Sequence, residues 1–232
     1  MHRRSTPESQ SQARLSEKER LDFSYLFYDA LKDKMLGNLP QAKSKLIQAI
    51  RVDPRNDAAH FEMAQIYLQE GNLDQALSSA NLALKFNPQN IWYKRVLVEI
   101  YAQRAEWSKQ IALLQEIAKQ TPGQTDVLYE LADACIMVRK YEEALKLYAQ
   151  IEKLEGYSED LLIRKKNLYL SLGKPGKAIE EIRKLVEKVP DEYEYRRILA
   201  EVYLMNRQPE KALEQYEEIL KRDPQNSFVH FS

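Results

Sequence analysis

The stretch DAAHFEMAQIYLQEGNLDQALSSANLALKFNPQN, residues 57–90, is one unit of a pattern that repeats along the chain. Pro88 stands near its end. A proline or a glycine recurs every 34 residues on either side of it, at Pro54, Pro122, Gly156, Pro190 and Pro224. A fixed period of this length indicates a repeat array, and 34 residues fit a unit of two helices. Each proline ends a unit because it has no N–H to donate and clashes with the preceding helical turn.

The 34-residue period divides the chain into an array with a short segment at each end. Residues 1–15 are polar and are predicted to form a flexible leader. The array extends over residues 16–226, with units at 23–56, 57–90, 91–124, 125–158, 159–192 and 193–226. Residues 227–232 match the truncated first helix of a further repeat, which indicates a fragment of a longer protein.

Each unit is predicted to hold two amphipathic helices of about 14 residues. Ser16 and Glu19 form a capping box, so the first helix is expected to run from about Glu17 to Leu36. Glycines suit the end of a first helix and prolines suit the start of a second. They occupy equivalent places in several units: Gly37, Gly71 and Gly173, and Pro40, Pro175 and Pro209.

Small side chains recur where two helices must approach closely. Such a contact needs a short side chain, and alanine provides it. One set of alanines lies in the first helices and another in the second helices: Ala30, Ala64, Ala132 and Ala200, then Ala42, Ala76, Ala144, Ala178 and Ala212. Three residues beyond the first set, a tyrosine recurs that can fill a broad gap: Tyr67, Tyr101, Tyr169 and Tyr203.

These residues carry a resemblance to a known family. The unit 57–90 resembles a tetratricopeptide repeat, through Met63, Ala64, Tyr67, Gly71, Ala76, Ala80, Ala83 and Pro88. The array is similar to bacterial tetratricopeptide repeat proteins, including envelope lipoproteins. The resemblance implies an all-α fold, a right-handed α-solenoid of antiparallel helix pairs. It also implies that the first helices line a concave groove that holds a peptide or a segment of a partner protein.

Several units depart from the family pattern, and two of the departures predict a change in packing. In unit 3, Val98 and Gln110 replace the two alanines, so its helices are expected to sit slightly apart. In unit 5, Lys165 and Lys166 stand where a leucine and a small residue are expected, and a buried lysine is costly unless it is paired. With Gly156 at the proline place, these lysines predict an irregular junction between units 4 and 5. A hinge or a degenerate repeat would explain it.

The overall charge of the chain is balanced. The chain carries 35 Lys and Arg against 35 Asp and Glu, so nothing in its net charge favours nucleic acid. No apolar run reaches the ~18 residues of a membrane helix, and direct membrane insertion is not expected. The sequence leaves the compartment open between cytoplasm and periplasm.

The residues that could carry chemistry are few and scattered. The single cysteine, Cys135, excludes an internal disulfide, and the three histidines are His2, His60 and His230. No phosphate loop, HExxH motif or Ca²⁺ loop is present. We therefore expect no catalytic residue, cofactor or metal site, and core positions for His60 and Cys135. The carboxylate pairs should form a solvated outer face with lysine partners such as Lys146: Glu142 and Glu143, Glu180 and Glu181, Glu217 and Glu218.

The groove is the remaining candidate site. The resemblance implies which positions of the first helices face the groove. The residues expected there to bind a partner are Phe27, Leu31, Phe61, Gln65, Trp92, Arg95, Glu99, Tyr129, Asp133, Asn167, Arg197 and Glu201. The N-terminal half is aromatic and apolar, and such a patch usually marks a binding site. The C-terminal half is acidic, which favours a ligand segment with apolar anchors and some basic character. Alternatively, Phe27 and Phe61 pack on a neighbouring helix or on the leader.

The sequence thus predicts a non-enzymatic scaffold or adaptor that binds a segment of a partner protein. Two alternatives stay open. One is a self-associating module, a homo-oligomer formed through the open C-terminal face or the groove. The other is the targeting arm of a longer protein whose other domain lies beyond residue 232.

Overall fold

The computed structural model describes residues 15–156 and 158–223 of the chain. The predicted leader up to residue 14, His2, His230, Pro224 and the segment 227–232 lie outside these residues.

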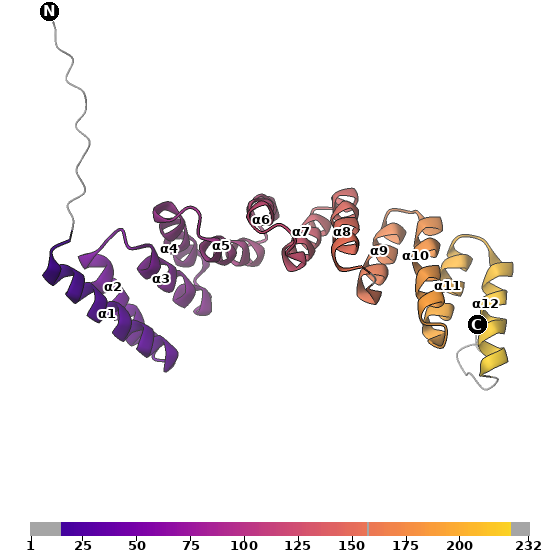
Figure 1. Ribbon diagram of the computed structural model, residues 1–232, viewed down its shortest axis with the longest axis horizontal. Coiled ribbons are helices and arrows are strands. Elements are labelled where there is room, and N and C mark those ends of the chain that lie inside the picture. The colour runs from indigo at the N-terminus through magenta and orange to yellow at the C-terminus, as the bar shows by residue number, and fades with distance from the viewer. Residues whose placement is uncertain (1–14, 157, 224–232) are drawn as a thin grey trace, which may run out of the picture. The chain divides into compact units, whose positions relative to one another are not determined.

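The described residues form twelve α-helices and no strand (Figure 1). The helices are α1 (Glu17–Met35), α2 (Leu39–Val52), α3 (Asp57–Gln69), α4 (Leu73–Phe86), α5 (Ile91–Gln103), α6 (Trp107–Gln120), α7 (Thr125–Met137), α8 (Tyr141–Glu155), α9 (Glu159–Ser171), α10 (Pro175–Lys188), α11 (Tyr193–Met205) and α12 (Pro209–Arg222). The fold is an all-α helical repeat solenoid, as the sequence predicts.

The chain divides into two compact units, residues 1–113 and 114–232, with the division inside α6. In the first unit, α1 packs on α2 and α3 on α4, and the pairs join through α2 with α3 and α4 with α5. In the second unit, the pairs are α7 with α8, α9 with α10, and α11 with α12. These helices therefore pack mainly on their neighbours in sequence, as in a repeat array.

The turn inside each helix pair has the same backbone conformation six times. A residue with positive φ follows each first helix at intervals of 34 residues: Gly37, Gly71, Ala105, Arg139, Gly173 and Arg207. The next residue's N–H donates back to the helix, as Asn72 does to the Tyr67 carbonyl at 2.8 Å. Glycine adopts this conformation freely, but an L side chain is strained in it. Packing of the helix pair thus imposes the turn even where the sequence has no glycine.

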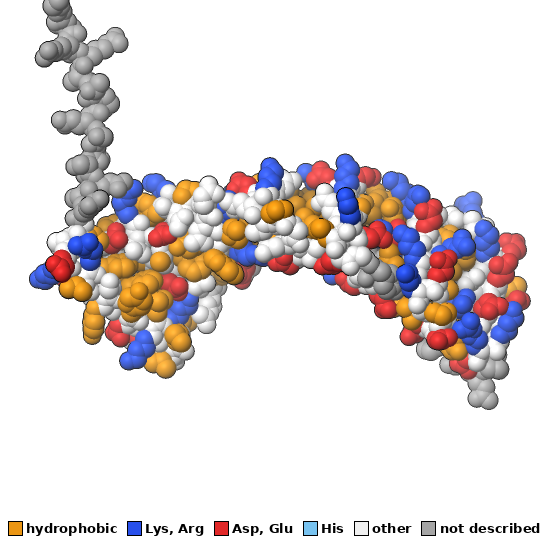
Figure 2. All heavy atoms as spheres, viewed as in Figure 1, with side chains coloured by type: hydrophobic (Ala, Val, Ile, Leu, Met, Phe, Trp, Pro, Cys, Tyr) orange, Lys and Arg blue, Asp and Glu red, His pale blue; other side chains and the backbone are white. Residues whose placement is uncertain are grey.

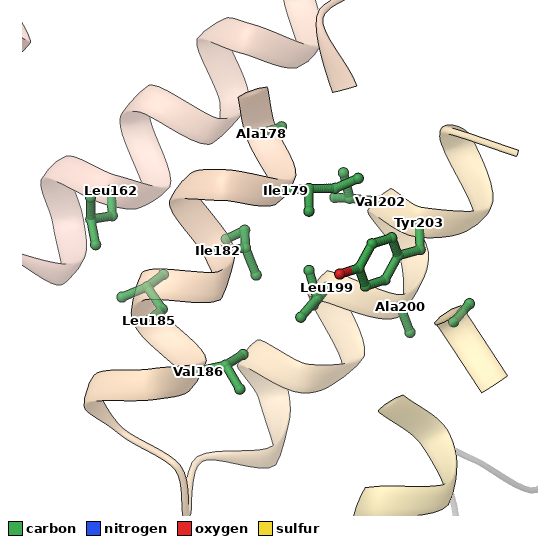
Figure 3. Packing of buried hydrophobic residues seen from close by; sticks show 11 residues of the cluster. Leu162, Ala178, Ile179, Ile182, Leu185, Val186, Leu199, Ala200, Val202 and Tyr203 are labelled. Carbon is green, nitrogen blue, oxygen red and sulfur yellow. The ribbon is translucent and has the colours of Figure 1, made fainter. Parts of the chain in front are cut away.

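The recurrent alanines are buried, as predicted. All nine are at most 1% exposed, so the helix pairs do meet at short side chains. In the second unit they contribute to a cluster in which Ile179 of α10 lies beside Val202 of α11, and Ile182 of α10 points toward Leu199 (Figure 3). In the first unit an equivalent cluster joins α1, α2 and α3.

The start of α1 confirms the capping box. The Ser16 hydroxyl accepts from the Glu19 N–H at 3.2 Å, and the Glu19 carboxylate accepts from the Ser16 N–H at 2.8 Å. These bonds satisfy two N–H groups that the first turn leaves free. The helix ends at Met35, one residue before the predicted end.

The backbone between α8 and α9 is irregular, as predicted. The residues that follow α2, α4, α10 and α12 all have negative φ between −127° and −140°. Gly156, which follows α8, has φ of +80° and ψ of −144°. A residue with a side chain would be strained here, so the glycine sets a different exit from α8.

The prediction that the paired carboxylates form a solvated outer face is wrong for Glu181. Glu142, Glu143, Glu180 and Glu217 are exposed, and Glu218 is half-buried. Glu181, however, is buried. Its neighbour on α9 is Lys165, whose ammonium group donates a hydrogen bond to the Glu181 carboxylate at 2.9 Å. The carboxylate thus points inward, to a cation that the repeat pattern does not predict.

Candidate functional site

Phe61 of α3 is held by a ring contact with the next first helix. Its ring centroid lies 4.8 Å from that of Tyr93 on α5. The Tyr93 hydroxyl donates to Asp57 at 3.0 Å, and Asn87 donates to the same carboxylate oxygen at 2.9 Å. Burial, together with the bond to Asp57, raises the pKa of Tyr93 to about 12. Phe61 is therefore half-buried, and only part of its ring can meet a ligand.

Trp92 is the most accessible aromatic side chain among the predicted groove residues. It is 70% exposed, whereas the neighbouring Tyr93 is buried. The Asn90 side chain accepts from the Trp92 N–H at 2.9 Å and caps α5. Trp92 thus stands in the first turn of a capped helix whose position is fixed by the Phe61–Tyr93 contact. An exposed indole on a rigid support is a preferred binding anchor.

Phe27 and Leu31 of α1 are both half-buried. The Phe27 ring stacks on Phe23 with centroids 5.5 Å apart, and both rings pack against the core of α1, α2 and α3. The packing alternative raised for Phe27 therefore holds. Phe27 offers a ligand less surface than its aromatic character suggests.

The polar groove residues of the first unit are already engaged. Lys34 donates to the Gln65 amide oxygen and to Glu62, the latter at 2.6 Å. Glu99 is exposed and accepts from Gln103, and Arg95 is half-buried. Lys34, which the sequence does not single out, links α1 to α3 and sets the orientation of Gln65.

In the second unit, three predicted residues gather around an arginine that the sequence reasoning missed. Arg164 of α9 donates to Asp133 at 3.2 Å and to Asp160 at 2.6 Å. Its guanidinium lies 5.5 Å from the centre of the Tyr129 ring. Asp133, Asn167 and Arg164 line a shallow pocket of about 240 Å³ with Tyr148. The bond to Asp160 raises the pKa of Arg164, which stays charged.

Arg197 and Glu201 lie together on α11. Arg197 donates to Glu201 and to Glu194, which flank it on the same helix. Hydrogen bonds raise the pKa of Arg197 and lower that of Glu194. Arg164 and Arg197 each pair with two acids, so the C-terminal half is less negative than its acidic residues alone suggest.

The two candidate core residues are packed as predicted. His60 is buried, and its Nε2 lies 2.9 Å from the Pro54 carbonyl oxygen. Cys135 is 1% exposed, and burial raises the pKa of its thiol, which makes it a poor nucleophile. Residues 15–156 and 158–223 contain no group of three or more His, Cys, Asp or Glu side chains placed to hold a metal ion. No helix in this part of the chain is long and apolar enough to cross a membrane.

The structure thus assembles the predicted residues as separate groups. In the first unit, Phe61 contacts Tyr93, the residue that follows Trp92 in the sequence. Phe27 is largely used for packing, and Gln65 for a bond to Lys34. Tyr129, Asp133 and Asn167 meet around Arg164 in the second unit. Arg164 could have been found from sequence by its spacing, because it lies four residues after Asp160 on one helix face.

Two tetratricopeptide repeat models match the sequence, at residues 35–100 and 167–227, which together exceed half of the chain. No curated protein matches it.

Solved structures with the same fold are more distant in sequence. A tetratricopeptide repeat protein from Parabacteroides merdae is 20% identical, with a TM-score of 0.63, and the match covers 87% of this chain and 80% of that one. A chain of the Naa15/Naa10 complex bound to HypK-THB is 17% identical with a TM-score of 0.70, over 91% of this chain and 33% of that one. YrrB, described as having an unusual peptide-binding site, is 14% identical with a TM-score of 0.55, over 80% and 96%.

Proposed function

The chain belongs to the tetratricopeptide repeat family, and from this membership we propose that it is a non-enzymatic scaffold that binds a segment of a partner protein on its first helices. The fold is generally a protein–protein interaction module. The printed descriptions of YrrB, with its peptide-binding site, and of Naa15/Naa10 bound to HypK-THB are precedents for such binding within the fold.

The exposure of Trp92 carries this proposal. A 70% exposed indole on a capped helix costs little conformational entropy to bind, because α5 is already fixed beneath it. The visible part of the Phe61 ring offers a second apolar contact on α3. A ligand segment with a large apolar side chain would remove both surfaces from water, at about 25 cal/mol for each Å² buried.

The group around Arg164 is proposed as a polar contact point in the second unit. The Asp133 carboxylate and the Asn167 amide are exposed beside a shallow pocket, and both can bond the main chain of an extended peptide. Arg164 already balances one of the two neighbouring acids. We therefore propose a ligand chosen by an apolar anchor and main-chain bonds, with a smaller preference for basic residues than the sequence suggests.

The array organisation is part of the proposal. We propose that the array comprises six 34-residue units, each with a first and a second helix.

The test begins with selection of peptide ligands from a random displayed library against residues 1–232. Fluorescence anisotropy then compares the affinities of the selected peptides for the wild type and for Trp92→Ala. A central anchor contributes 2 kcal/mol or more, so Trp92→Ala is expected to weaken binding about 30-fold. The matched control is Ile47→Ala, which removes an exposed apolar side chain from the second helix α2, within the same compact unit of residues 1–113.

Helicity measured by circular dichroism must be unchanged in both variants, which is expected because both side chains are exposed. Peptides that bind Trp92→Ala as tightly as the wild type would refute the role of Trp92. Loss of binding in Ile47→Ala alone would move the site to the second helices.

A further inference from the structure

The first helix, α1, presents large apolar side chains on two opposite faces. One face packs Phe23, Phe27 and Ala30 on the core. The other carries a run of exposed apolar side chains, visible along α1 in Figure 2. Five of the twelve exposed large hydrophobic residues in the described chain lie on α1 or at its C-cap, each between 65% and 88% exposed: Leu21, Tyr25, Tyr28, Met35 and Leu36. A helix that is apolar on two faces is normally covered on both.

The spacing of these residues is that of a helix-packing seam. We define the outer stripe of α1 as Leu21, Tyr25, Tyr28, Lys32 and Met35. The intervals are four, three, four and three residues, which average the 3.5 residues of a coiled-coil repeat. The stripe extends along nearly the whole helix. A second helix therefore fits this surface better than an extended peptide does.

The sequence before α1 is a poor cover for the stripe. Met1 and Leu15 are the only large apolar side chains among the residues before α1. Burying the stripe requires several such side chains at helical spacing, and this segment does not supply them.

The outer stripe of α1 is complementary to itself when one copy runs opposite to the other. Its centre is Tyr28, with Leu21 seven residues before and Met35 seven residues after. A two-fold axis at Tyr28 places Leu21 of one copy against Met35 of the other, as an isologous contact requires. It also places Lys32 near the Tyr25 ring of the second copy, where an ammonium group and an aromatic face attract each other.

We propose that the outer stripe of α1 is a homodimer interface in which the α1 helices of two copies pack antiparallel about Tyr28. The antiparallel direction also opposes the two helix dipoles, which is favourable. A single pair of 19-residue helices buries less than the roughly 800 Å² per partner of a standard interface. The dimer therefore dissociates on dilution. Trp92 is not part of this surface, so the inference stands independently of the proposed partner site.

Sedimentation velocity across a concentration series tests the dimer. Residues 1–232 of the wild type are expected to shift from monomer to dimer as concentration rises. Tyr28→Lys sets two like charges against each other at the two-fold axis, so this variant is expected to stay monomeric. Leu213→Lys is the control, because it changes another exposed apolar residue, on α12, with 58% exposure against 67% for Tyr28. A monomeric wild type, or a dimer lost in Leu213→Lys and kept in Tyr28→Lys, would overturn the proposal.

Cysteine cross-linking tests the antiparallel register. Tyr28→Cys is expected to form a disulfide dimer on oxidation, while the native Cys135 is buried and does not compete. Leu21→Cys alone is not expected to cross-link, because its two copies would lie about 21 Å apart along the helices. A mixture of Leu21→Cys and Met35→Cys is expected to form the mixed dimer. Cross-linking of Leu21→Cys with itself would show parallel pairing and contradict the proposal.

Discussion

The ammonium group of Lys165 on α9 lies 2.9 Å from a carboxylate oxygen of Glu181 on α10, and both side chains are 7% exposed. Glu152 on α8 accepts from the same ammonium group at 2.8 Å, and Lys184 on α10 lies 3.0 Å from Glu181. Three consecutive helices are thus joined by a charge network at the junction where the repeat pattern fails. Lys165 stands where the repeat pattern expects a leucine, and its two ion pairs compensate for the burial of its charge.

Removal of Lys165 alone is expected to be costly. Lys165→Leu leaves Glu181 buried with only the half-exposed Lys184 as partner, and breaking a buried ion pair typically costs 3–5 kcal/mol. The double variant Lys165→Leu/Glu181→Leu restores an apolar contact and is expected to lose markedly less stability than the sum of the single variants. Urea unfolding followed by circular dichroism measures all three. Additive single effects would show that the two side chains do not interact.

The same network predicts a stability change in acid. Burial raises the pKa of Glu152, but hydrogen bonds and charge from Lys165 and Lys184 outweigh it, and the net pKa is lowered. A lowered pKa gives stability that is present above the unfolded value of 4.5 and lost as pH falls through the folded value. Glu152→Gln should therefore flatten the fall in melting temperature below about pH 4.5. An unchanged pH profile in this variant would contradict the assignment.

The hydroxyl of Tyr93 is expected to ionise at a higher pH than that of an ordinary tyrosine, since burial and Asp57 raise its pKa from 10.0 to about 12. Because the folded pKa is raised, the stability it contributes is present below pH 10 and is lost as pH rises through 12. Chemical shifts of ring-labelled tyrosine, assigned with Tyr93→Phe, measure the titration. Asp57→Asn removes the charge but not the burial, so the pKa should fall only part of the way.

The left-handed turns offer stabilising substitutions. Ala105 and Arg207 have φ of +54° to +56°, where a side chain costs roughly 1–2 kcal/mol and glycine does not. Glycine relieves this strain but also raises the entropy of the unfolded chain, which offsets part of the gain. Ala105→Gly and Arg207→Gly are each expected to stabilise the fold by up to about 1 kcal/mol. Thermal unfolding measures this. The matched control, Ala149→Gly on the exposed face of α8, should instead destabilise, because glycine weakens a helix interior.

The repeating part of the fold could be predicted because it depends on local signals. The 34-residue period fixes where the turns fall, and the alanines mark the helix contacts. Arg139 and Arg207 show the limit of this reasoning, since nothing in their residue type indicates a positive φ. The neighbouring helices impose it.

Pairs between distant residues escaped prediction. The Tyr93 hydroxyl donates a hydrogen bond to Asp57, and the Tyr195 hydroxyl donates one to Glu159 at 2.7 Å. The same tyrosine–carboxylate bond thus occurs twice, each time between residues 36 positions apart. Each partner alone is an ordinary surface residue type. The sequence alone places Glu181 on the solvated face, because its partner, Lys165, lies 16 residues away on another helix.

The sequence predicts which positions belong to the candidate site but not how exposed each side chain is. Phe27, Phe61 and Trp92 are alike in sequence, as aromatic residues on first helices. Their exposures differ because Phe27 stacks on Phe23 and Phe61 on Tyr93, whereas Trp92 remains open. The exposure of each aromatic side chain depends on whether a neighbouring residue packs against it, and its own residue type does not determine that.

The most direct test of the proposed partner site is the emission spectrum of Trp92. Trp107→Phe leaves Trp92 as the single tryptophan, and a selected peptide ligand without tryptophan is added to saturation. Our account predicts a shift of the emission to shorter wavelength, because the peptide removes water from an indole that is 70% exposed in the free protein. A saturating peptide that leaves the spectrum unchanged would show that binding occurs elsewhere and would contradict the central claim.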